Sequence, residues 1–80
     1  MSEDDTQRSE ATLLTEYRET VLAYEAIREE IIALLESNDG GTQKMSDEEY
    51  MRYREMARRR DTLYDHMKHL EVLLLGEDAL

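Results

Sequence analysis

"ESNDGGTQKMSDEE", residues 36–49, is the stretch that decides the fold, because the helical pattern of apolar residues stops in it and resumes after it. Gly40 and Gly41 lie at its centre, and glycine is preferred just past the C-terminal end of a helix, where a left-handed residue is needed. Ser46 and Glu49 have the spacing of a capping box, in which each side chain bonds the backbone of the other residue. The stretch therefore predicts a break between two helices.

The remainder of the chain predicts helix on both sides of this break. The 80 residues include no proline and only three glycines, and these are the residues that most often interrupt a helix. Gly76 follows the apolar run "EVLLL", where a second helix would end. The predicted segments are a disordered acidic tail at residues 1–8, a helical hairpin at 9–75 and a C-terminal tail at 76–80. Within the hairpin they are a helix at 9–37, a loop at 38–46 and a helix at 47–75.

Two helices of equal length joined by a short polar loop predict an antiparallel hairpin. In each helix, apolar and long side chains recur at alternating spacings of three and four, as in a coiled coil. The first row is Leu14, Tyr17, Val21, Tyr24, Arg28, Ile31 and Leu35. The second row is Tyr53, Met56, Arg60, Leu63, Met67, Leu70 and Leu74. Folding the chain about residue 42 aligns the rows and pairs Tyr24 with Arg60, so we expect an all-α, coiled-coil-like hairpin.

The apolar surface of each helix is wider than its row. On the first helix the apolar arc spans about 160° at 100° per residue, which is more than one neighbouring helix covers. The flanking residues are Leu13, Ile27, Leu34 and Ile32 on the first helix and Ala57, Tyr64, Leu73 and Leu75 on the second. We therefore expect self-association as a homodimeric four-helix bundle, or docking on another protein. The predicted interface consists of the two rows and Tyr64.

Five arginines between residues 52 and 60 stand out in a chain of net charge -10. Residues 1–36 hold ten acids and three bases, a net charge of -7, whereas residues 47–75 hold seven acids and six bases, a net charge of -1. On a helical wheel the five arginines point in different directions, and phosphate binding relies on an excess of cations. Direct nucleic-acid binding is therefore not expected, and we expect the arginines to serve as partners for the acids.

Some of these arginines have acids within reach on their own helix. Glu48 with Arg52 and Glu55 with Arg59 have the i,i+4 spacing that favours an ion pair. The first helix has few bases of its own, so a neighbouring helix that supplies arginines would relieve the repulsion among its glutamates.

Arg28 and Arg60 each interrupt an apolar row, and two interpretations are open. In the first, the aliphatic stem packs on the row while the guanidinium reaches solvent. In the second, the arginine is a buried device that fixes the register, with Arg60 stacked on Tyr24 or Tyr64 and bonded to a glutamate of a second chain.

No constellation of residues predicts catalysis. Asp65, His66 and His69 in "DHMKH" share one helix, but zinc needs a fourth ligand and second-shell support, so solvated surface is the favoured interpretation. The turn "NDGG" lacks the lysine of a phosphate-binding loop. We expect a protein without enzymatic activity, cofactor or metal.

One segment resembles a known enzyme family. "AIREEIIALLES", residues 26–37, is similar to the opening helix of the small helical chorismate mutases. That family has an arginine soon after the paired leucines, whereas Ser37 and Asn38 stand here. The resemblance therefore does not carry the family's activity to this chain.

Composition also bears on location. The chain has no cysteine, no apolar stretch approaching about 20 residues, and an acidic N-terminus unlike that of a signal peptide. These features predict a cytoplasmic protein that does not enter membranes.

The favoured function is a small non-catalytic interaction module, an adaptor or regulator, that self-associates and docks on a larger protein through apolar and tyrosine-bearing helix faces. The alternative is an acidic mimic of nucleic acid that inhibits a DNA- or RNA-binding protein. Its phosphate-like acids would be Glu16, Glu19, Glu29, Glu30 and Glu36.

Overall fold

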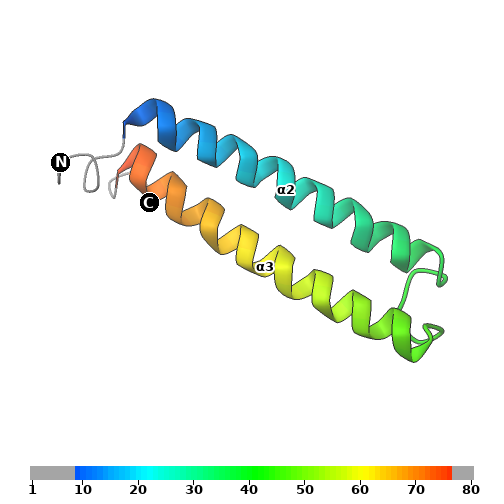
Figure 1. Cartoon of the computed structure of the whole chain (residues 1–80). Coiled ribbons are helices and arrows are strands. Elements are labelled where there is room, and N and C mark those ends of the chain that lie inside the picture. The colour runs from blue at the N-terminus through cyan, green and yellow to red at the C-terminus, as the bar shows by residue number, and fades with distance from the viewer. Residues whose placement is uncertain (1–8, 77–80) are drawn as a thin grey trace.

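The computed structural model describes residues 9–76, which form a hairpin of two helices (Figure 1). Helix α2 spans Glu10–Glu36 and helix α3 spans Asp47–Leu75. The helices run antiparallel, with the loop at one end and Ser9 and Gly76 at the other. Two packed helices without a strand in this part of the chain confirm the all-α class and the hairpin. The predicted tails lie outside the described residues, apart from Gly76.

Both helices begin at a serine that caps the free backbone amides of the first turn. The Ser9 hydroxyl accepts a bond from the Thr12 amide at 3.2 Å. At the start of α3, the Ser46 hydroxyl accepts from the Glu49 amide at 3.1 Å, and the Glu49 carboxylate accepts from the Ser46 amide at 3.1 Å. The predicted capping box is therefore confirmed.

Loss of this cap is expected to weaken α3. Ser46→Ala removes the hydroxyl acceptor and should lower the free energy of unfolding by about 1 kcal/mol. Ser46→Asp keeps an acceptor at the same position and should stay close to the parent protein. Urea unfolding followed by circular dichroism compares the two variants, and equal loss in both would contradict a capping role.

The loop ends α2 through backbone geometry and one buried amide. Asp39 and Gly40 have φ angles of 60° and 84°, in the left-handed region, and the Gly40 amide donates to the Leu35 carbonyl at 2.7 Å. The buried Asn38 side chain donates to the Leu34 carbonyl at 2.9 Å. The last carbonyls of α2 are thus satisfied within the loop.

The core lies between the helices near the loop end. Its buried members are Ile27, Ile31, Leu34 and Met56, and Leu35, Met45, Tyr53 and Leu63 pack against them. Leu70, fully buried, and Leu13 extend the buried row toward the open end. The hairpin measures 53 × 26 × 16 Å, so it is one helix thick in its smallest dimension and few side chains are enclosed on all sides.

The row of α2 that faces α3 differs from the predicted one. The buried positions of α2 are Leu13, Thr20, Ile27, Ile31 and Leu34, and Asn38 continues the row in the loop. Leu14 is 48% exposed and Arg28 is exposed, so at these positions the prediction is wrong by one residue. The buried row was not predicted because Thr20, one of its members, is polar. The Thr20 hydroxyl donates to the Glu16 carbonyl at 2.8 Å, so this side chain can be buried without an unpaired donor.

At the helix edges, side chains contact residues one helical turn away from the partners predicted by folding the chain about residue 42. Tyr24 meets Tyr64 rather than Arg60, with ring centroids 5.9 Å apart. Side chains on a helix lean toward its N-terminus, and in an antiparallel pair this brings together residues from adjacent turns.

Candidate interaction surfaces

All five tyrosines lie along one side of the hairpin. Tyr24 contacts Tyr64 across the helices, and Tyr50 and Tyr53 stack with centroids 6.3 Å apart. Tyr53 and Tyr64 are 11 residues apart, which is close to three helical turns and places them on the same side of α3. We call this side the tyrosine face, and it comprises Tyr17, Tyr24, Tyr50, Tyr53 and Tyr64 with the neighbouring Leu14, Ile32 and Leu75.

Several apolar side chains of the tyrosine face are only partly covered by the hairpin itself. Leu14, Ile32 and Leu75 are 48%, 44% and 67% exposed, and Tyr50 and Tyr64 are each 43% exposed. Of the flanking residues predicted as surplus apolar surface, Ile32, Tyr64, Leu73 and Leu75 are exposed. The prediction is wrong for Leu13, Ile27 and Leu34, which are buried between the helices.

Cations lie over two of the rings. The Arg28 guanidinium is 5.8 Å from the Tyr24 ring centroid, and the Lys68 ammonium is 5.5 Å from that of Tyr64. Arg60 is half-buried and bonds the adjacent Asp61 at 3.1 Å. Both arginines therefore keep their charged heads at the surface within the chain, and a register bond to a second chain stays a prediction.

Glu71 joins the two helices at the open end of the tyrosine face. The Tyr17 hydroxyl donates to one carboxylate oxygen at 2.9 Å and the Lys68 ammonium to the other at 3.3 Å. These bonds, that of Tyr17 above all, hold the pKa of Glu71 below its ordinary value of 4.5. The same carboxylate raises the pKa of Tyr17 and of Lys68.

The lowered pKa of Glu71 makes the stability of the hairpin depend on pH. A carboxylate whose pKa is lower in the folded than in the unfolded protein stabilises the fold at a pH above its unfolded pKa. This contribution is lost as the pH falls through the pKa of the folded protein. Tyr17→Phe should therefore raise the pKa of Glu71 toward 4.5. It should also lower the urea midpoint at about pH 7 more than at about pH 3. Carboxyl NMR titration and urea unfolding measure the two effects. Tyr50→Phe is the control, since the Tyr50 hydroxyl forms no hydrogen bond with residues 9–76; an equal effect there would refute the assignment.

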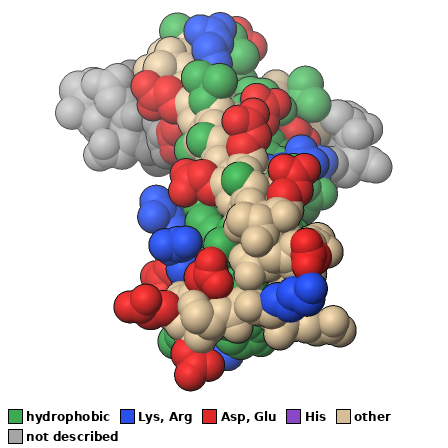
Figure 2. Space-filling view, turned by 90° about the vertical axis from the view of Figure 1, so that its right-hand side faces the viewer, with side chains coloured by type: hydrophobic (Ala, Val, Ile, Leu, Met, Phe, Trp, Pro, Cys, Tyr) green, Lys and Arg blue, Asp and Glu red, His purple; other side chains and the backbone are tan. Residues whose placement is uncertain are grey.

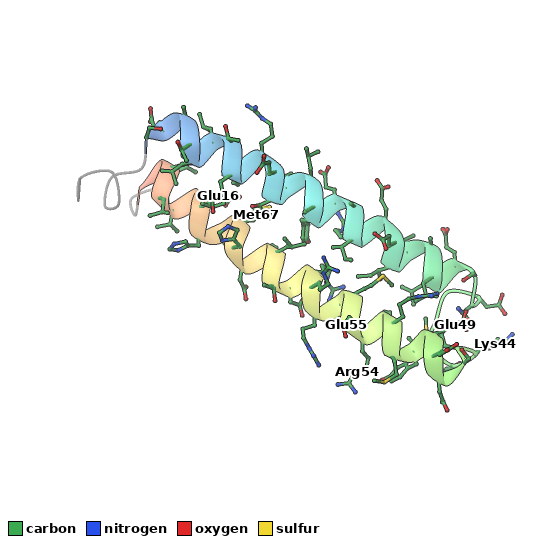
Figure 3. All side chains as sticks on the ribbon, viewed as in Figure 1. Glu16, Lys44, Glu49, Arg54, Glu55 and Met67 are labelled. Carbon is green, nitrogen blue, oxygen red and sulfur yellow. The ribbon has the colours of Figure 1, made fainter. Side chains whose placement is uncertain are left out.

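The opposite side of the hairpin carries a groove between the helices. Figure 3 shows Glu16 on the side of α2 that faces α3, and its carboxylate lies 3.0 Å from the His66 Nε2 atom. The groove lies nearer the loop and is lined by Ala23, Ala26, Ile27, Glu30, Arg52, Glu55, Met56, Arg58, Arg59, Thr62 and Leu63. We call this side the groove face.

The arginines of the groove face are unpaired within the described chain. Arg52, Arg58 and Arg59 form no ion pair or hydrogen bond with residues 9–76. The expected i,i+4 pairs with Glu48 and Glu55 are therefore wrong. The guanidinium groups remain available to acids of another chain.

Acidic side chains cover much of the rest of the surface. Figure 2 looks onto the loop end and shows acidic side chains spread across it, with hydrophobic side chains exposed between them. The exposed acids of α2 without an ion pair to residues 9–76 are Glu10, Glu19, Glu25, Glu29, Glu30 and Glu36.

The three candidate metal ligands of "DHMKH" differ in exposure. His66 is half-buried beside Glu16, whereas Asp65 and His69 are exposed. No group of three His, Cys, Asp or Glu residues within the described part of the chain could hold a metal ion. In that same part, neither α2 nor α3 has the length and apolar character needed to span a bilayer.

The predicted interface residues divide by their burial within the hairpin. The buried members are Ile31, Met56 and Leu70, and the exposed members are Leu14, Arg28 and Tyr64. The half-buried members are Tyr17, Val21, Tyr24, Leu35, Tyr53, Arg60, Leu63, Met67 and Leu74. Most of the predicted set therefore contributes to the hairpin itself, and its use by a second chain stays a prediction. Sequence reasoning missed the groove face, whose only signal is the recurrence of small residues at Ala23 and Ala26 beside Glu30.

Comparison with protein-family models, curated proteins and solved structures finds no match for this chain.

Proposed function

We propose that the chain is a small non-catalytic interaction module, an adaptor or regulator, that self-associates and docks on a larger protein. The observation that carries the proposal is the set of large apolar side chains at least 43% exposed. They are Leu14, Leu22, Ile32, Tyr50, Met51, Tyr64, Leu73 and Leu75. Several of these side chains lie on the tyrosine face, and a contiguous exposed apolar patch marks a site of protein association whose burial stabilises a complex by about 25 cal/mol per Å².

The tyrosine face has the composition of a docking surface. Tyrosine and arginine are enriched among the residues that dominate binding energy, because both combine apolar area with directional polar groups. Its ring pairs and cation contacts already restrain several of these side chains, including Tyr24 and Tyr64, so binding immobilises fewer rotamers. We assign the larger partner protein to this face.

Self-association and docking are tested by two measurements. Sedimentation equilibrium should show a dimer. Ile32→Arg should then reduce recovery of the larger protein on the immobilised chain at least tenfold, because it places a charge in the apolar part of the tyrosine face. Met51→Arg is the control, since Met51 is 63% exposed and lies off the tyrosine face. Met51 is one helical turn before Arg54, which projects away from α2. A monomer whose recovery of partners is indifferent to Ile32→Arg would contradict the proposal.

The unpaired glutamates of α2 favour one second candidate, an acidic mimic that occupies the site of a nucleic acid on its binding protein. Salt distinguishes the two functions. Docking through apolar burial should survive about 0.5 M salt, where the Debye length falls to roughly 4 Å, whereas binding through mimicry of phosphates should be lost.

A further inference from the structure

We propose that the groove face is where two copies of the chain pair about a two-fold axis. In this dimer α2 of each copy lies in the groove of the other, with its glutamates against the arginines of that copy. The inference rests on the self-association proposed above and assigns it to one face.

The groove has the size and lining to receive a helix. A second hollow shares Glu30, Arg52 and Met56 with it and extends it to Ser37. The groove therefore follows α2 from Ala23 to Ser37, about 20 Å at 1.5 Å per residue. Both walls are helices whose backbone groups are bonded internally, so an extended segment would find no backbone partners there. A helix brings its own satisfied backbone and can lie between two others by ridge-into-groove packing.

The walls of the groove differ in side-chain size. Its floor is apolar, with Ile27, Met56 and Leu63, whereas the α2 wall presents the small side chains of Ala23 and Ala26. Small side chains allow two helix backbones to approach closely, and methionine adapts to the surface that packs on it. A second α2 can therefore lie beside the first and reach the floor.

Charge selects the second copy as the occupant. Arg52, Arg58 and Arg59 are unpaired along the α3 rim, and Glu30 is unpaired on the α2 rim. Glu19 lies further toward the open end on the same side of α2, and it forms no ion pair with residues 9–76. A two-fold axis places the acidic α2 side of each copy against the α3 arginines of the other, so one surface complements itself. This arrangement supplies external cations to Glu19 and Glu30.

The tyrosine face is less suited to pairing with itself. Arg28 and Lys68 already lie over its rings, and Glu71 is occupied by Tyr17 and Lys68. These groups already have partners, so this face offers a second copy less charge complementarity than the groove face does. Assigning the dimer to the groove face leaves the tyrosine face open for a different protein.

Charge exchange between two variant chains tests the pairing. Arg52→Glu with Arg59→Glu makes both sides of the groove acidic, and Glu19→Arg with Glu30→Arg makes both more basic. Each double variant alone should lose at least tenfold in dimer affinity by sedimentation equilibrium in low salt. Their mixture should recover the affinity, because each acidic side then meets a basic one. Failure of the mixture to associate more tightly than either variant alone would overturn the inference.

A matched control separates local from global charge. Arg18→Glu with Arg54→Glu changes the net charge by the same amount as the arginine double variant. Both side chains are exposed away from the groove, and Figure 3 shows Arg54 projecting from the side of α3 that faces away from α2. The dimer affinity of the control variant, Arg18→Glu with Arg54→Glu, should stay within about threefold of the parent, a difference under 1 kcal/mol. A loss equal to that of the arginine double variant would also overturn the inference.

Single cysteines give an independent readout in this cysteine-free chain. Ala26→Cys should oxidise to a covalent dimer, because residues near a two-fold axis meet their own copies, whereas Ile32→Cys on the tyrosine face should not. Circular dichroism checks that each variant keeps its helix content. Cross-linking at residue 32 alone would show self-association through the other face and overturn this inference. A parent chain that remains monomeric would instead reject the proposed self-association itself.

Discussion

Ile31→Ala is expected to lower the free energy of unfolding by about 3 kcal/mol, because it removes three carbons from the buried cluster and leaves a cavity. Ile31 is 5% exposed and packs in the same cluster as Ile27, Leu34 and Met56. A single core in a chain of this size rarely supplies more than about 3–5 kcal/mol, so the loss is most of the stability. Urea unfolding at low protein concentration measures it.

Ile32→Ala is the matched control, since it makes the same chemical change one residue further along α2. Ile32 is 44% exposed and lies outside the cluster. Its replacement should cost under about 0.5 kcal/mol, partly offset by the better helix propensity of alanine. A larger loss at residue 32 than at residue 31 would mean that the buried row of α2 is misassigned.

The two-helix arrangement could be predicted because its signals are local. Gly40 needs a left-handed backbone, and Ser46 and Glu49 bond each other's backbone, so a few neighbouring residues set the end of one helix and the start of the next. The absence of proline leaves both flanks free to continue as helix. Such features do not depend on packing, and they emerge from the sequence alone.

The facing row of α2 depended on packing and was harder to predict. Both candidate rows contain leucines and isoleucines at heptad spacing, and polarity at Thr20 and Asn38 argues against the row that is buried. Each of these side chains bonds a carbonyl of α2, at 2.8 and 2.9 Å, which removes the cost of burial. Hydrophobicity alone cannot reveal a polar residue that satisfies itself. On α3 the predicted row is interrupted only by Arg60, which stays half-buried, and Met56 and Leu70 are buried as predicted.

The groove face escaped prediction for a different reason. Ala23 and Ala26 add little to an apolar pattern, and their significance is the space that they leave beside Ile27. The i,i+4 spacing within one helix predicts an ion pair between Glu55 and Arg59, beside the expected pairing of arginines with acids of a neighbouring helix. In the hairpin that pair does not form, and the pairing of these arginines with acids of another chain stays a proposal.

Leu70→Lys is expected to unfold the hairpin. Leu70 has no exposed surface, and the ammonium of a lysine there would be buried without a partner unless the helices separate at the open end. The loss of the apolar side chain adds to this cost, and the sum exceeds the roughly 3–5 kcal/mol that a core of this size supplies. Far-ultraviolet circular dichroism should show loss of most helical signal, because isolated helices of this kind depend on tertiary packing. Leu73→Lys makes the same substitution on the same helix, where the side chain is 49% exposed, and should keep the helical signal. Retention of a folded, cooperative hairpin by Leu70→Lys would show that α3 does not pack on α2 through this residue, and the antiparallel register would then have to differ at the open end.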